Sequence, residues 1–238
     1  MDIRNSVVFI TGANRGIGKA LVEAALNHGA KKIYAAARKL EDLPNFNDSR
    51  VVPIALDITD RAQVKKAAEA ASDTQLLINN AGARATAPIL EGAMEMLMRD
   101  MEVNYFGTLS ITRAFVPTIA RNGGGAIATI SSIAGLASMA AVGGYSASKA
   151  ALSSAIQGMR VELKDSNIRV HAIFPGPIDT GMARAVHKHR SNVNETAENI
   201  IAGIEQGSED IYPDPVSSEI GTLWAHDPKE VARAFANL

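Results

Sequence analysis

The sequence predicts an α/β protein, in which a doubly wound parallel β-sheet carries helices on both faces. Short apolar segments alternate along the chain with longer segments of helical periodicity. The apolar segments lack polar alternation, which is typical of parallel strands buried on both faces. The first of them ends in a glycine-rich turn that opens a helix. A chain of 238 residues needs no second core, so we expect a single domain over residues 1–238.

Each element follows from a local pattern. The first strand (7–11) leads through the glycine turn into a helix (16–28), which ends at Gly29, a residue that favours the left-handed helix end. Further apolar runs predict strands at 32–37, 51–56, 76–79, 126–131 and 169–174, and a short last strand at 210–212. Helical spacing predicts helices at 61–71, 91–119, 144–165, 182–190, 195–206 and 228–236.

Composition excludes several classes of function. The net charge of −1 argues against a nucleic-acid or membrane-surface protein. The chain has no cysteine, hence no disulfide framework, thiolate metal site or cysteine nucleophile, and we expect no metal. Residues 122–148 carry no charge, but their glycines, serines and threonines indicate a buried strand and an active-site loop rather than a membrane span. No secretory signal is visible, so we expect a cytoplasmic protein.

Tyr145 and Lys149 are the most informative pair of residues. Four residues apart, they project from one face of a helix. A free tyrosine has a pKa of about 10, and a neighbouring cation favours the phenolate, which would move the pKa toward the working range. By itself the pair also fits a solvated helix face. Its meaning depends on the preceding serines, Ser131 and Ser132, and on the glycine turn.

That turn has glycines where dinucleotide binding needs them. After a parallel strand, Gly12 permits a sharp turn, Gly16 lets the backbone approach a pyrophosphate, and Gly18 allows close packing of helix on strand. The free N–H groups at the start of the helix then face the phosphates. The spacing Gly-x3-Gly-x-Gly, behind a strand and ahead of a helix, predicts a Rossmann-type cofactor site.

Together these motifs resemble the short-chain dehydrogenase/reductase family in its shorter single-domain form. The resemblance covers residues 7–181 and rests on motifs in the family's order: Thr11-Gly12-x3-Gly16-x-Gly18, Asp57, Asn79-Asn80-Ala81-Gly82, Asn104, Ser132, Tyr145-x3-Lys149 and Pro175-Gly176-Pro177-Ile178-Asp179-Thr180. Residues 210–214 depart from the glycine-rich last strand of many members, which bears on assembly. The resemblance implies a homodimer or homotetramer.

The family likeness implies four catalytic roles. Tyr145 would protonate a carbonyl oxygen as hydride arrives, and Lys149 would lower the pKa of the tyrosine and bind the nicotinamide ribose. Ser132 would polarise the substrate oxygen. Ser131 is the neighbouring alternative, but successive strand residues face opposite ways. Asn104 would support a water linking Lys149 to solvent, or would bond the main chain as a buried helix asparagine.

The resemblance also implies that residues 1–130 mainly bind the cofactor, and that residues 131–238 supply the catalytic groups and a flap over the substrate. We expect the flap at residues 181–199. Apart from Tyr145 and Lys149, the expected cofactor contacts are Gly12, Asn14, Arg15, Gly16, Ile17, Gly18, Arg38, Asp57, Ile58, Asn80, Ala81, Gly82, Pro175, Gly176, Ile178 and Thr180.

Charge favours NADP(H) as the cofactor. In NAD-preferring members an acid at the end of the second strand binds the adenosine ribose and repels a 2′-phosphate. Here Arg38 follows Ala37, and the first carboxylate is Glu41. Arg15, in the glycine turn, would converge with Arg38 on the phosphate, although both could be ordinary surface arginines. Asp57 would meet the adenine, or would serve only to cap the next helix.

The sequence therefore predicts an NADPH-dependent carbonyl reductase, reversible as an alcohol dehydrogenase. Its substrate would be a small apolar ketone, aldehyde or secondary alcohol, since no charged anchor is evident except that Arg84 could reach it. By analogy the pocket would be lined by Ile133, Ala134, Met139, Pro177, Met182 and Val186. The alternatives are an NAD-linked alcohol dehydrogenase and a catalytically idle NADP-binding regulator. Met94, Met98 and Met101 share a helix face that we assign to the core or to a subunit contact.

Overall fold

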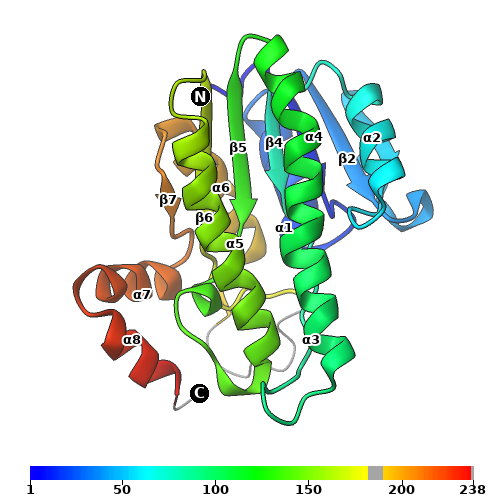
Figure 1. Cartoon of the computed structure of the whole chain (residues 1–238). Helices are drawn as coiled ribbons and strands as arrows, with labels where there is room; N and C mark the ends of the chain where they lie inside the picture. Colours follow the sequence, from blue (N-terminus) through cyan, green and yellow to red (C-terminus); the bar gives the residue numbers. More distant parts are fainter. Residues whose placement is uncertain (182–189, 237–238) are drawn as a thin grey trace.

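The computed structural model describes residues 1–181 and 190–236. In these residues seven parallel strands form one sheet, in the order β3-β2-β1-β4-β5-β6-β7 (Figure 1). The strands are β1 (Val7–Thr11), β2 (Lys32–Ala37), β3 (Val51–Ala55), β4 (Leu76–Asn79), β5 (Gly125–Ile130), β6 (Ile168–Ile173) and β7 (Asp210–Ile211). The chain winds outward from β1 in both directions, which confirms the predicted doubly wound, Rossmann-like α/β fold.

Helices cover both faces of the sheet. They are α1 (Gly16–Asn27), α2 (Arg61–Ala70), α3 (Met94–Met101), α4 (Thr108–Arg121), α5 (Gly143–Glu162), α6 (Val193–Gln206), α7 (Pro215–His226) and α8 (Pro228–Phe235). One apolar core lies where α1 and α6 pack on the sheet, and a second lies under α2 and α4. A third joins α5 and β6 to α7 and α8.

The expected helix over residues 91–119 differs from the structure in two ways. It begins only at Met94, because Gly92 turns back to the carbonyl of Pro88 and Ala93 is extended. Its middle is a π-helical segment, Glu102–Gly107, which joins α3 to α4 and contains Asn104. Such π segments widen a helix by one residue and are frequent at functional sites.

One helix was missed: α7 was not predicted. Asp214 accepts a hydrogen bond from the N–H of Ser217, and Pro215 occupies the first helical position. Asp227 and Pro228 start α8 in the same way. Each Asp-Pro pair supplies a cap and a preset backbone angle, so this repeated signal was present in the sequence.

The expected flap and its helix lie partly outside the described residues. Nothing is described for residues 182–189, which include Met182 and Val186. Of the rest of the flap, residues 193–199 form the start of α6, where Asn192 caps the helix and Ala197 is buried. Helix α6 thus begins at Val193, two residues before the predicted start, and the flap itself stays a prediction.

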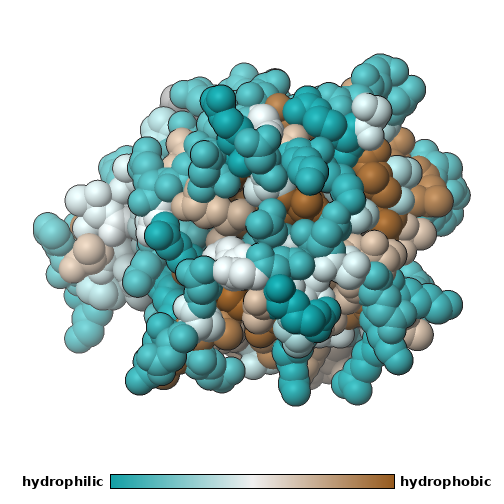
Figure 2. Space-filling model, turned by 90° about the horizontal axis from the view of Figure 1, so that it is seen from above, coloured by the Kyte–Doolittle hydropathy of each residue, from teal (hydrophilic) through white to brown (hydrophobic). Residues whose placement is uncertain are grey.

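The apolar surface of α3 corrects another expectation. The side chains of Met94 and Met98 are 62% and 64% exposed, and Met101 is half-buried. They are not core residues, which leaves the subunit contact as the interpretation. In the described residues no helix is long and apolar enough to cross a membrane. Seen from above, where the amino ends of the strands lie, the surface is mostly hydrophilic with small separate apolar patches (Figure 2).

Candidate active site

The expected site residues gather at the carboxyl ends of the strands, the lower end of the sheet in Figure 1. The strand order reverses between β1 and β4, and in open parallel sheets ligands bind beside such a point. Asn80 joins these two strands, because its amide Nδ2 donates to the carbonyls of Thr11 and Gly12 at 2.9 and 3.0 Å. The Thr11 hydroxyl in turn accepts from the N–H groups of Asn80 and Ala81.

The glycine turn fits a phosphate-bearing cofactor. Gly12 and Gly16 have φ of 66° and 55°, in the left-handed region that glycine adopts without strain. A Cβ on Gly18 would lie 2.1 Å from the carbonyl oxygen of Gly12, so only glycine allows this approach. Helix α1 follows extended Arg15 with no side-chain cap and no acidic residue in its first turn. The N–H groups at its start are therefore available to an anion.

The segment after β6 reaches this turn. Pro175 and Ile178 are buried, and a Cβ on Gly16 would lie 3.2 Å from a methyl carbon of Thr180. The N–H of Gly176 donates to the carboxylate of buried Asp214 at 2.8 Å. Asp214, the cap of α7, thus fixes the Pro175–Pro177 turn through this bond. The sequence analysis missed this positioning role.

The remaining expected cofactor residues have varied surroundings. Asn14 and Ile17 are half-buried at the glycine turn, and Ile58 is buried against Gly107. The Oδ1 atom of Asp57 accepts from the N–H and hydroxyl of Thr59, so it stabilises the turn that precedes α2, where Asp60 is the cap. The cap that we had kept as the alternative role of Asp57 is thus supplied by Asp60, and the contact of Asp57 with adenine stays a prediction.

Arg15 and Arg38 are both exposed side chains, Arg38 directly after β2 and Arg15 in the glycine turn. The Nη1 of Arg15 lies 3.5 Å from the position that a Cβ on Gly181 would take, so its guanidinium is close to the segment after β6. The convergence of the two arginines on a 2′-phosphate stays a prediction.

Ser132 and Tyr145 form the centre of the catalytic group. The Ser132 hydroxyl acts on the Tyr145 hydroxyl to lower the tyrosine pKa, and this partly offsets the rise that burial causes. The Ser132 hydroxyl also accepts from the N–H of Ala134 at 3.1 Å. Ser131 points the other way, since its hydroxyl donates to the carbonyl of Lys149 and bonds the hydroxyl of Ser153. The alternation along the strand end thus selects Ser132, as we expected.

Lys149 lies on the same face of α5 as Tyr145, with its Nζ 5.8 Å from the centre of the tyrosine ring. It is buried and donates to the carbonyl of Ile130 at 2.7 Å. Burial lowers the pKa of Lys149 to about 8, and the negative charge of Asp100 opposes this.

The pKa of Tyr145 departs from the expectation. Burial raises it above the usual value, the hydrogen bond with Ser132 and the charge of Arg84 lower it, and Asp100 raises it further. We expected the neighbouring cation to lower the tyrosine pKa below its usual value. Desolvation is the larger effect in this structure, because it disfavours the phenolate.

Asn104 bonds the main chain, as in the alternative interpretation. Its side-chain Oδ1 accepts from the N–H of Ala83 at 2.8 Å, and its Nδ2 donates to the carbonyl of Ala83 and to the hydroxyl of Ser148. Both partners adjoin the catalytic group, Ser148 preceding Lys149 in the helix. Asn104 is therefore a positioning residue in this structure.

Buried Asp100 is a second residue that the sequence analysis did not single out. Its carboxylate accepts from the N–H of Ala85 at 3.1 and 3.2 Å. Burial raises the pKa of Asp100, and the Ala85 N–H and the charges of Arg99, Lys149 and Arg84 oppose this. A buried charged group beside Lys149 could not be recognised before α3 was placed against α5.

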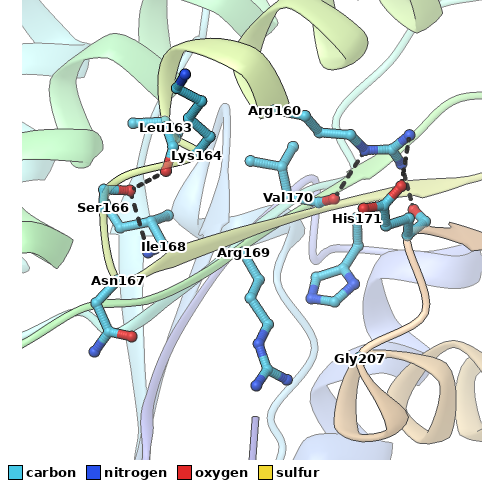
Figure 3. Close-up of a pocket in the computed structure, with 11 residues that line it drawn as sticks. Arg160, Leu163, Lys164, Ser166, Asn167, Ile168, Arg169, Val170, His171 and Gly207 are labelled. Carbon is cyan, nitrogen blue, oxygen red and sulfur yellow. Dashed lines mark hydrogen bonds and ion pairs between the residues drawn. The ribbon is translucent and has the colours of Figure 1, made fainter.

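The expected pocket residues are only partly accessible. Ile133 and Ala134 are buried behind Ser132, whereas Met139 and Pro177 are half-buried. A separate cleft of about 380 Å³ lies at the amino end of β6, lined by residues such as Arg160, Lys164 and His171 (Figure 3). None of the expected catalytic residues lines this cleft, which lies at the opposite end of the strand. The described residues hold no cluster of three or more acidic or histidine side chains suited to a metal ion.

Comparisons with known proteins find similarity to short chain dehydrogenases. A family model described as short chain dehydrogenase matches residues 6–191. An oxidoreductase of Botryotinia fuckeliana is 33% identical over 74% of this chain, and the match spans 66% of that relative's length. The crystal structure of a short chain dehydrogenase from Burkholderia cenocepacia in complex with NADP has 41% identity and a TM-score of 0.94, covering 99% of both chains. A Burkholderia phymatum short chain dehydrogenase/reductase in complex with NAD, at 24% identity and a TM-score of 0.85 over 97% of this chain and 96% of its own, is similar in fold.

Proposed function

Because the chain belongs to the short chain dehydrogenase family, whose members are oxidoreductases that bind a nicotinamide cofactor, we propose that it is an NADPH-dependent carbonyl reductase, reversible as an alcohol dehydrogenase. The observation that carries the proposal is the placement of Lys149 over the Tyr145 ring, with its Nζ 5.8 Å from the ring centre, together with the effect of the Ser132 hydroxyl on the same tyrosine. Two hydroxyl groups at one point can both bond a single substrate oxygen. An aldehyde or ketone presents such an oxygen, and a secondary alcohol presents it in the reverse reaction.

The roles of the side chains follow from their positions. A bound nicotinamide cofactor would supply a hydride to the carbonyl carbon, so that the C=O double bond becomes a C–O single bond with a new C–H bond and a new O–H bond. Tyr145 donates the proton to the oxygen, and its raised pKa keeps it protonated at neutral pH, as reduction requires. Ser132 donates a second hydrogen bond where negative charge develops. In alcohol oxidation the same tyrosine must accept a proton, for which a cation beside it is needed.

The preference for NADPH rests on charge at the end of β2. Exposed Arg38 follows Ala37 there, and no carboxylate occurs before Glu41. A 2′-phosphate would find a planar cation, whereas an NAD-specific site would offer an acid. The NADP complex of the Burkholderia cenocepacia protein supports this choice. We keep an NAD-linked alcohol dehydrogenase as the second candidate, since the Burkholderia phymatum protein of similar fold is in complex with NAD.

The substrate that we propose has an apolar part, because Met139 and Pro177 are half-buried at the site and Ile133 lies behind Ser132. The cofactor contacts named from the sequence remain predictions, as do a single functional domain and a cytoplasmic location. The exposed faces of Met94, Met98 and Phe106 support a homodimer or homotetramer.

The test is a panel of aldehydes and ketones assayed by NADPH consumption, and of secondary alcohols assayed by NADP⁺ reduction. Turnover that depends on Tyr145 would support the proposal. Tight NADPH binding without turnover of any carbonyl would instead favour the idle regulator.

A further inference from the structure

Arg84 occupies a position that the main chain fixes on both sides. The N–H and carbonyl of Ala83 are both bonded by Asn104, at 2.8 Å each, and the N–H of Ala85 donates to Asp100. Asn104 and Asp100 are fully buried in the helices behind this loop. Two buried polar side chains therefore hold the backbone immediately before and after one arginine.

The loop lies alongside the start of α5. A Cβ on Gly82 would lie 3.8 Å from the Nζ of Lys149, and the carbonyl of Ala87 accepts from the N–H of Gly144 at 3.4 Å. Residues 82–87 thus run from Lys149 back to the first turn of the helix. Arg84 lies between these two contacts, at the level of the catalytic face.

Electrostatics agree with this placement. The positive charge of Arg84 acts on the hydroxyl of Tyr145 and lowers its pKa, against the larger effect of burial. Asp100 interacts with Arg84 at longer range but directs its carboxylate to the N–H of Ala85. Within residues 1–181 and 190–236, no hydrogen bond or ion pair to the half-buried Arg84 guanidinium is found. A half-buried guanidinium whose charge acts on Tyr145 and which has no partner among these residues is available to an anion.

We propose that Arg84 binds a carboxylate of the substrate, so that the enzyme reduces oxo acids or oxidises the corresponding hydroxy acids. This inference rests on the proposed function, because it names the substrate class of the same site. A guanidinium offers two parallel N–H donors that match the two oxygens of a carboxylate. The sequence had suggested an apolar substrate, with Arg84 as the one charged residue that could reach it. The proposal adds an anionic group to that apolar body as the partner of Arg84.

Three pairs of substrates test the inference: benzoylformate, 3-benzoylpropionate and 4-acetylbenzoate, each against its methyl ester. Each ester keeps the reacting carbonyl and the apolar body but removes the charge. We expect the wild type to have a higher kcat/KM for at least one acid than for its ester. Arg84→Met should lower kcat/KM for that acid by about 10- to 100-fold and leave the ester within about threefold, because one charge-assisted bidentate contact is lost.

The controls separate this role from others. Arg113→Met removes an exposed arginine from α4 and should change neither substrate. Arg84→Lys keeps the charge without the fork and should retain part of the preference. Ester turnover by Arg84→Met reports that the variant is folded, and its Kd for NADPH should equal that of the wild type. A weaker Kd for NADPH would make Arg84 a cofactor contact and overturn the inference.

Equal turnover of acids and esters in the wild type, unchanged in Arg84→Met, would overturn the inference while the proposed function stands. If no carbonyl is reduced, calorimetric binding of the same acids to the NADP⁺ complex decides. Binding that Arg84→Met abolishes would support the carboxylate site and remove the reductase proposal. Binding that does not depend on Arg84 would overturn the inference too.

Discussion

Asn104 bonds both main-chain groups of Ala83, with its Oδ1 accepting from the N–H and its Nδ2 donating to the carbonyl, each at 2.8 Å. Only a carboxamide can do both. Asn104→Asp should therefore lose the hydrogen bond to the Ala83 carbonyl and place a carboxylate oxygen against that carbonyl oxygen. The repulsion between these two acceptors should loosen the loop that carries Arg84. We expect kcat to fall more than tenfold, with the Kd for NADPH nearly unchanged, because a buried acceptor is left unpaired.

The corresponding measurement is hydrogen exchange of residues 82–87 in the two proteins. Faster exchange in Asn104→Asp, together with the loss of kcat, identifies a positioning role. Unchanged exchange with reduced kcat would instead indicate that Asn104 acts through a water, which was our first expectation.

Tyr145→Phe should keep the fold and cofactor binding but lose most turnover. The ring volume is conserved while the proton donor beside Ser132 is removed, and a positioned acid or base contributes about 10²- to 10⁴-fold. Single-turnover rates measure the chemical step, and NADPH fluorescence titration is the control for binding. Near-wild-type rates in the variant would contradict the assigned mechanism.

Cofactor preference should follow the residue pair at the end of β2. Ala37→Asp with Arg38→Leu should reverse the preference from NADPH toward NADH, because a carboxylate then faces the 2′-phosphate and a charge-assisted bond is lost. The ratio of kcat/KM for the two cofactors is the measurement. Arg15→Leu is the comparison variant, and its smaller effect is expected since its guanidinium lies near Gly181. A wild type that uses NADH as well as NADPH would refute the charge argument.

Burial of Lys149 should make stability depend on pH. Its pKa is about 8 in the folded, cofactor-free protein, compared with 10.5 as the usual value. Below pH 8 both the folded and unfolded states hold the proton, and the cost of burying the charge is fully present. Between pH 8 and pH 10.5 the folded state has released the Lys149 proton while the unfolded state still holds it. The contribution of Lys149 to the free energy of unfolding therefore rises with pH in this range.

The comparison is with Lys149→Met, which cannot titrate. Between pH 7.5 and 9.5 the free energy of unfolding of the wild type should gain about 2 kcal/mol on that of the variant. Urea unfolding of both proteins at the two pH values measures this difference in the free energy of unfolding. Both pH values lie below the range in which Tyr145 titrates. A constant difference would mean that Lys149 keeps a nearly ordinary pKa.

Two glycines on different helices, Gly18 in α1 and Gly158 in α5, should respond oppositely to alanine. In Gly18→Ala the new Cβ would meet the carbonyl oxygen of Gly12 at 2.1 Å, so the glycine turn must shift. We expect a loss of several kcal/mol in stability and of cofactor binding. In Gly158→Ala, inside α5, no atom lies within 4 Å of the new Cβ, and the variant should gain about 0.5–1 kcal/mol from helix propensity. Thermal unfolding of both variants checks the pair.

The sequence alone determined the local features of this protein. Buried strands, the glycine turn and the spacing of Tyr145 and Lys149 are encoded within a few residues of one another, because strand and helix periodicity are local properties. They were sufficient for the fold and for the family, which the structure and the comparisons confirm. The Asp-Pro signal of α7 was local too and was overlooked.

Only the tertiary structure decided what surrounds the catalytic group. The raised pKa of Tyr145, the buried carboxylate of Asp100 beside Lys149 and the bond from Gly176 to Asp214 join segments distant in the chain. Desolvation depends on every atom packed around a group, and Coulomb interactions depend on distances that no spacing in the sequence fixes. The effect of the Arg84 charge on Tyr145 belongs to the same class, since it depends on the packing of α3 against α5 and on the bonds that hold residues 83 and 85.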